Sequence, residues 1–72
     1  MKEEIQSILE DALPLVDFDS DFLFAELTSL DVAHMLIILG DKYGVQLGAK
    51  DVTPKNFKNL DAIVKMVQDK MQ

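Results

Sequence analysis

Apolar side chains that recur at the spacing of one helix face constrain the fold of this chain more than any other feature. Near the start, five of them follow the pattern i, i+3, i+4, i+7 and i+8. They are Ile5, Ile8, Leu9, Ala12 and Leu13. A similar stripe near the end consists of Leu60, Ile63, Val64, Val67 and Met71. No segment sustains period-two alternation, so we predict an all-α fold without a sheet.

Residues that cap or break helices mark the ends of the first two. The first helix should stop at Pro14, because the proline ring cannot continue the backbone hydrogen-bond ladder. The second should begin at Thr28 or Ser29 and run to about Tyr43. Thr28 and Asp31 have the spacing of a capping box, in which each side chain accepts a hydrogen bond from the other residue's backbone N–H.

Three further caps complete the predicted helices. Gly44 follows the second helix as a C-terminal cap. Thr53 is the predicted N-cap of a short helix, Pro54–Lys58, that turns Phe57 inward. Asn59 is the predicted N-cap of the last helix. The 72 residues are therefore predicted to form a single domain, a small four-helix bundle of three longer helices and one short one.

The connection between the first two helices, residues 14–27, is long and rich in apolar side chains. Its seven large apolar residues are Leu15, Val16, Phe18, Phe22, Leu23, Phe24 and Leu27. Large apolar side chains are favoured in protein interiors, so we expect most of these to pack onto the bundle.

Composition excludes several classes of function. The net charge is −6 and cysteine is absent, which excludes thiolate chemistry and argues against nucleic-acid binding. Residues 1–31 carry nine acids and one Lys, whereas residues 32–72 carry four acids and six Lys. The longest apolar run, Met35–Leu39, is far too short to span a membrane. We expect a cytoplasmic monomer with no membrane span.

The sequence contains no motif for metal binding or for hydrolytic catalysis. Asp17, Asp19 and Asp21 have the spacing of a calcium loop, but Phe22 and Thr28 stand where that loop needs Gly and Glu. His34 is the only histidine and has no other ligand residue at metal-binding spacing. Five residues separate Ser29 from His34 on one helix, so the two point in different directions and do not form a catalytic pair. We predict no metal site and no enzymatic activity.

The second predicted helix is apolar on more than one side. Residues near 31, 34, 37/38 and 41 share a face, on which Ile37 or Ile38 would be exposed. An exposed apolar spot ringed by charge is typical of a docking surface, although a central helix can also be buried on most sides.

Ser29 is the most informative single residue. A serine at a helix start usually serves as the N-cap, but here Thr28 can take that role. Ser29 would then lie in the first turn with its hydroxyl free. A phosphate ester there would face unpaired backbone N–H groups and the positive end of the helix dipole.

Four stretches together resemble the acyl carrier protein family. They are Leu23-Phe24-Ala25-Glu26-Leu27, Thr28-Ser29-Leu30-Asp31, the helix that ends in Tyr43-Gly44-Val45, and the run from Asp51 to Ile63. The family's serine motif is Asp-Ser-Leu, and Ser29 occupies the position of its serine. The resemblance covers nearly the whole chain.

The resemblance implies a freestanding acyl carrier for fatty acid, lipid or polyketide synthesis. It implies that Ser29 receives 4'-phosphopantetheine from coenzyme A and that the thiol of this arm holds acyl groups as thioesters. The implied partners are a phosphopantetheinyl transferase and acyl-handling enzymes such as synthases, acyltransferases and ligases. Their implied docking residues are Thr28, Leu30, Asp31, His34, Ile37 and Asp41.

Two alternatives remain open. One is a carrier of aminoacyl or peptidyl groups, which shares the fold and the arm. The other is a helical interaction module descended from carriers that bears no arm, an alternative suggested by Thr28 in place of the usual aspartate.

Overall fold

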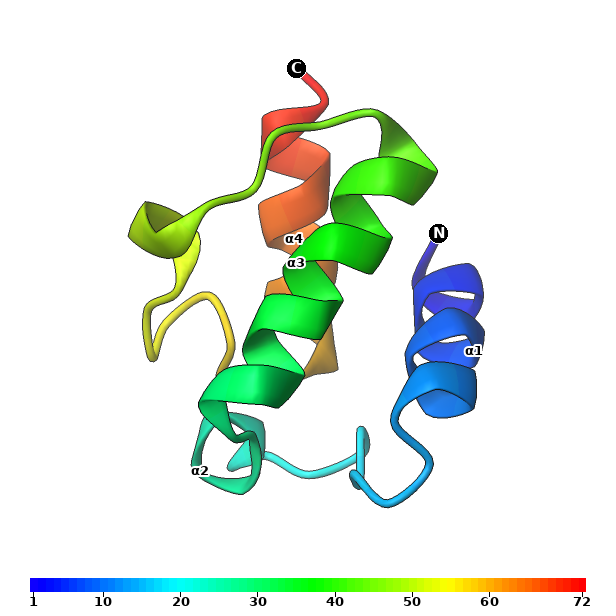
Figure 1. Ribbon diagram of the computed structural model, residues 1–72, viewed down its shortest axis with the longest axis vertical. Coiled ribbons are helices and arrows are strands. Elements are labelled where there is room, and N and C mark those ends of the chain that lie inside the picture. The colour runs from blue at the N-terminus through cyan, green and yellow to red at the C-terminus, as the bar shows by residue number, and fades with distance from the viewer.

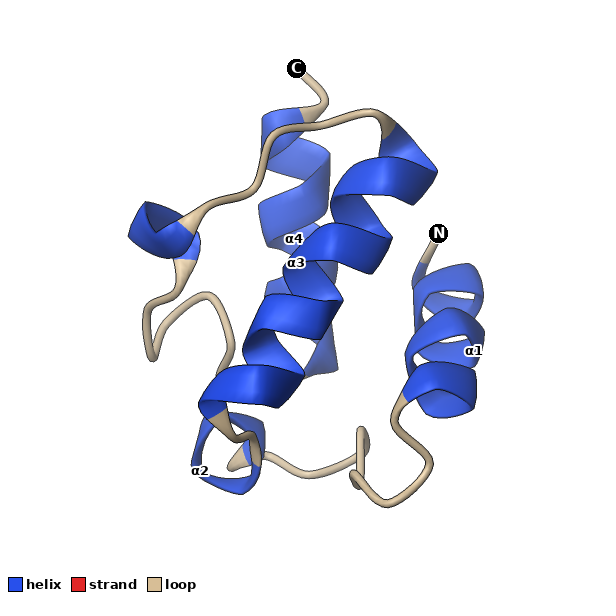
Figure 2. Ribbon diagram, in the orientation of Figure 1, coloured by secondary structure: helices blue, strands red, loops and turns tan.

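The computed structural model describes residues 1–72 and contains helices and loops but no strand (Figures 1 and 2). The helices are α1 (Lys2–Ala12), α2 (Leu23–Glu26), α3 (Ser29–Tyr43) and α4 (Leu60–Lys70), with a 3-10 turn η1 (Ala49–Asp51). The predicted all-α fold is confirmed. No helix in it is both long enough and apolar enough to cross a membrane.

The three longer helices surround one apolar core. Figure 1 shows α3 in front of α4 with α1 beside them, and thirteen buried apolar side chains from these helices and the loops form a single cluster. Ile5 and Leu9 of α1, predicted from the first stripe, belong to it. In the last stripe the prediction was wrong for Met71, which lies beyond the end of α4 and is exposed, whereas Met66 is buried.

Most helix ends follow the predicted caps. The Thr28 hydroxyl accepts a hydrogen bond from the Asp31 N–H, and the Asp31 carboxylate accepts one from the Thr28 N–H, both at 3.1 Å. Gly44 ends α3 with a φ of 64°, the left-handed conformation that glycine adopts without strain. The side chain of Asn59 caps α4 by accepting a hydrogen bond from the Ala62 N–H at 2.9 Å.

The predicted short helix Pro54–Lys58 was wrong, because this segment forms a single turn. Thr53 does act as a cap, with its hydroxyl accepting from the Asn56 N–H at 3.0 Å, and Phe57 is buried as predicted. The chain bends at Lys58 and Asn59 after this turn, and Asn59 is extended, with φ −156° and ψ 179°, where it caps α4. The short helical elements are instead α2 and η1.

The connection 14–27 is packed only in part. Val16, Phe18, Leu23 and Leu27 contact the core. Leu15, Phe22 and Phe24 are exposed, so the prediction that most of the seven pack is confirmed by the other four. The single turn of α2 explains the split for two of them, because it turns Leu23 inward and leaves Phe22 and Phe24 outside.

Candidate functional site

Ser29 is the first residue of α3 and its side chain is exposed. The capping hydroxyl of this helix is that of Thr28, whose partner is the N–H of Asp31. The Ser29 hydroxyl takes part in no hydrogen bond of the protein. It is therefore free to be modified without loss of the cap.

The backbone around Ser29 favours an anion. The N–H groups of Ser29 and Leu30 open a helix of 15 residues and have no acceptor in the protein. The positive end of the helix dipole lies at the same place. A phosphate bound to the Ser29 oxygen would lie beside these groups, so the residues present fit a phosphate ester.

An apolar groove of about 520 Å³, which we call the Ser29 groove, begins at this serine. Of the nine residues that line it, seven are hydrophobic and none is charged. Its apolar walls include Phe24, Leu27, Val32, Leu36, Ala49 and Val52. A chain attached to Ser29 could lie along this surface. Sequence reasoning missed the groove because its walls come from α2, α3 and the η1 region, whose packing the helical periodicity does not specify.

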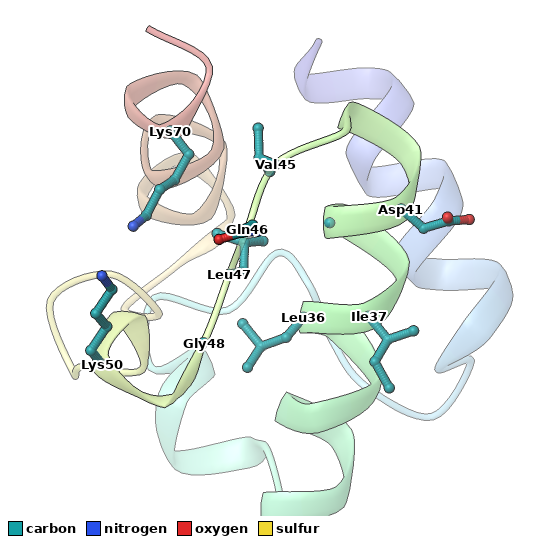
Figure 3. A pocket seen from close by; sticks show the side chains of 10 residues that line it. Leu36, Ile37, Asp41, Val45, Gln46, Leu47, Gly48, Lys50 and Lys70 are labelled. Carbon is teal, nitrogen blue, oxygen red and sulfur yellow. The ribbon is translucent and has the colours of Figure 1, made fainter.

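A second groove of about 750 Å³, which we call the lysine groove, adjoins the first at Leu36 (Figure 3). Leu36, Ile37, Val45 and Leu47 supply its apolar surface. Lys50 and Lys70 border it on one side, and in Figure 3 their amino groups point into the same space. Asp41, the only acid that lines it, points away from the two lysines (Figure 3).

Four of the predicted docking residues form one exposed stripe along α3. They are Leu30, His34, Ile37 and Asp41. Their spacing of i, i+4, i+7 and i+11 places them on one side of the helix, opposite its buried side chains. Leu30 and Ile37 are 80% and 70% exposed. The exposure of Ile37 agrees with the prediction.

Thr28 and Asp31 lie apart from this stripe. Thr28 precedes the helix, and Asp31 is half-buried with its carboxylate bonded to the Thr28 N–H. These two side chains hold the start of α3 and so position Ser29.

The remaining chemistry of the chain is limited. No group of three or more His, Asp or Glu side chains is placed to hold a metal ion. His34 lies on the exposed stripe and makes no hydrogen bond with Ser29. The structure therefore brings Ser29 together with a cap, free N–H groups and a groove, and with no catalytic partner.

Comparison of the chain with protein-family models, with curated proteins and with solved structures finds no match.

Proposed function

We propose that this chain is a carrier domain that holds acyl intermediates as thioesters on a 4'-phosphopantetheine arm attached to Ser29, for fatty acid, lipid or polyketide synthesis. The observation that carries the proposal is the free, exposed hydroxyl of Ser29 at the start of α3, where an uncharged apolar groove begins. The arm contributes a terminal thiol, which is the group that forms the thioester. The protein contributes the attachment point and the surface that partners recognise.

In the reaction that attaches the arm, the hydroxyl oxygen of Ser29 is the nucleophile. This oxygen bonds to the phosphorus that carries the pantetheine chain of coenzyme A, and the diphosphate bond of coenzyme A breaks. The adenosine bisphosphate leaves, and the hydroxyl proton passes to a base of the transferase. The free N–H groups of Ser29 and Leu30 would stabilise the phosphodiester charge that stays on the protein.

The exposed stripe on α3 supports docking of a phosphopantetheinyl transferase and acyl-handling enzymes. Leu30 and Ile37 provide apolar contacts beside the attachment point, and Asp41 provides an acidic one. The N-terminal half of the chain carries most of the acids, which would steer the domain toward basic partner surfaces. Because all of these groups are exposed, added salt should weaken that steering.

The test is the intact mass of the protein after incubation with coenzyme A and a broad-specificity phosphopantetheinyl transferase. We expect wild type to gain one phosphopantetheine and Ser29→Ala to gain none, with little change in stability because Thr28 retains the cap. Ser7→Ala, which alters an exposed serine of α1, is the matched control and should load as wild type does.

Failure of wild type to load, including with the transferases of its native host, would contradict the carrier proposal. The arm-less interaction module would then be the better hypothesis, with the α3 stripe as its surface. If the arm is attached but its thiol forms a thioester only with the help of an amino-acid-activating enzyme, an aminoacyl or peptidyl carrier would instead be favoured.

A further inference from the structure

We propose that the acyl cargo of this domain ends in a carboxylate, which binds between Lys50 and Lys70 in the lysine groove. This inference rests on the proposed attachment of the arm to Ser29, and it adds the chemical class of the cargo. It follows from the path between the two grooves and from the charges at the far end of that path.

The two grooves adjoin each other along α3, which offers a path from Ser29 to the lysines. Both are lined by Leu36, and Ala49 of the first adjoins Gly48 and Lys50 of the second. From Ser29 to Gly40 the path follows eleven residue-to-residue steps of α3, about 16 Å at the rise of an α-helix. An extended chain attached to the Ser29 oxygen can follow this path to the lysine groove.

The path changes character along its length. No charged residue lines the Ser29 groove, so this part suits an uncharged chain. At the far end two lysines border the space, in a protein whose net charge is −6 (Figure 3). Cationic side chains next to an apolar surface suit a ligand with an apolar body and an anionic end.

The two lysines have only one carboxylate between them. The Lys70 amino group lies 3.0 Å from a carboxylate oxygen of Asp51, and the other oxygen of Asp51 accepts from the Gly48 N–H. Lys50 forms no salt bridge. Asp41 lines the same groove but points away from the lysines (Figure 3). The amino group of Lys50 is therefore available to an added anion.

In the loaded domain, an anion that binds there would come from the cargo. The pantetheine chain is uncharged beyond the phosphate at Ser29, so it carries nothing to pair with an ammonium group. A methyl-ended acyl chain would leave Lys50 without a partner. A carboxylate at the end of the acyl group would pair with Lys50 and would lie within the field of Lys70.

The experiment compares two arms on the same protein. The transferase loads wild type from coenzyme A thioesters of equal chain length, one ending in a methyl group and one in a carboxylate, and mass spectrometry verifies loading. We expect the carboxylate-ended arm to shift the NMR signals of the lysine ammonium groups and of the amides of residues 48–51. At low salt we also expect hydroxylamine to cleave the thioester of the carboxylate-ended arm up to about fivefold more slowly than that of the methyl-ended arm. This is the size of effect typical of an exposed ion pair.

Two variants separate a specific contact from a general charge effect. Lys50→Gln removes an exposed ammonium group of the lysine groove, and Lys55→Gln removes an exposed one outside both grooves. The difference between the two arms should disappear in Lys50→Gln and persist in Lys55→Gln. Equal behaviour of the two arms on loaded wild type would overturn the inference about the cargo. Loss of the difference in both variants would overturn it as well. Neither outcome would contradict the carrier proposal. Failure to load would overturn both.

Discussion

The two ends of α3 are held in contrasting ways. At the end that begins with Ser29, the reciprocal bonds of Thr28 and Asp31 cap the helix, and the hydroxyl of Ser29 is free. At the other end, Tyr43 bonds to Glu4 of α1, and Val45 passes directly over Gly40. One helix therefore has an end that anchors it and an end that presents a reactive group.

The anchored end depends on two close contacts in the loop after α3. A side chain on Gly40 would place its Cβ 3.0 Å from the Val45 carbonyl oxygen, and the Val45 N–H donates to the Gly40 carbonyl at 3.1 Å. Asp51 then ties the same loop to α4 through Lys70. The contrast teaches that the proposed attachment site at Ser29 lies away from the residues that anchor the other end of α3, so that changes at the anchored end should leave Ser29 intact.

The largest effect on stability is expected from a comparison of Leu39 and Ile37, which lie two positions apart on opposite sides of α3. Leu39 is fully buried, so Leu39→Ala should cost about 2–5 kcal/mol of unfolding free energy through lost burial and a cavity. Ile37 is 70% exposed, so Ile37→Ala should change stability by less than about 0.5 kcal/mol. Urea denaturation followed by circular dichroism measures both.

The same two substitutions should affect the rate of phosphopantetheine loading in the opposite order. Ile37→Ala removes an apolar contact of the proposed docking stripe and should slow the transferase at limiting carrier concentration. Leu39→Ala, assayed where it is still folded, should load at nearly the wild-type rate. Equal loading by wild type and Ile37→Ala would remove Ile37 from the docking surface.

The next effect concerns the tie between the loop and α4. The Gly48 N–H, and after it Lys70, holds the pKa of the Asp51 carboxyl below its usual value. Asp51→Asn should therefore cost about 1–3 kcal/mol near neutral pH, because Lys70 loses its charged partner in a half-buried site. The exposed pair of Lys65 and Asp69 provides the control, since Asp69→Asn should cost less than about 1 kcal/mol.

The pH dependence of this cost has a definite sign. A carboxyl whose pKa is lower in the folded protein stabilises it above the unfolded-state pKa, about 4, and this contribution is lost as pH falls through the folded-state pKa. The difference between wild type and Asp51→Asn should therefore shrink in acid. A difference that stays constant from neutral pH to acid would show that the charge of Asp51 does not matter.

A smaller effect is expected where the chain crosses Gly40. Gly40→Ala gains about 1 kcal/mol of helix propensity, but its Cβ would press on the Val45 carbonyl, which the Gly44 turn holds in place. Overpacking costs about 1–3 kcal/mol, so we expect a net loss of stability of about 1 kcal/mol. Gly48→Ala is the matched control, because its Cβ would meet nothing within 4 Å and its φ is −139°. A Gly40→Ala protein more stable than wild type would show that the loop moves aside.

The sequence predicted the helices better than what joins them. Local signals determine α1, α3 and α4. The caps at Thr28 and Asn59 bond to residues three positions away, and the cap at Gly44 depends on the conformation of that glycine. The predicted helix at 54–58 is only a turn, and the residues after it contact neighbouring elements: the Lys58 carbonyl accepts from the Leu23 N–H, and Asn59 caps α4. Contacts of this kind depend on the neighbouring element and leave no periodic pattern.

The candidate site divides in the same way. Ser29, its cap and the exposure of Ile37 could be predicted, because all three follow from positions on one helix. The grooves could not be predicted, since Lys50 and Lys70 are twenty residues apart and line one groove only because the fold brings η1 and α4 together, where Asp51 pairs with Lys70. The exposure of Phe22 was also missed, because an apolar residue in a loop carries no sign of which way a single helical turn will direct it.

The smallest effect should come from the contact between α1 and the anchored end of α3. The Tyr43 hydroxyl donates to Glu4 at 2.5 Å, and burial together with this bond raises the pKa of Tyr43 to about 12. Tyr43→Phe should lower the melting temperature only slightly, since Glu4 remains exposed to water. A tyrosine whose pKa is raised on folding stabilises the protein fully below its unfolded-state pKa, about 10, and loses this contribution as pH rises through its folded-state pKa. The gap between wild type and Tyr43→Phe should therefore close between about pH 10 and pH 12. Lysine deprotonation in that range affects both proteins and cancels in the difference. A gap that persists there would mean that the bond donated by the protonated Tyr43 hydroxyl to Glu4 is not the source of the added stability.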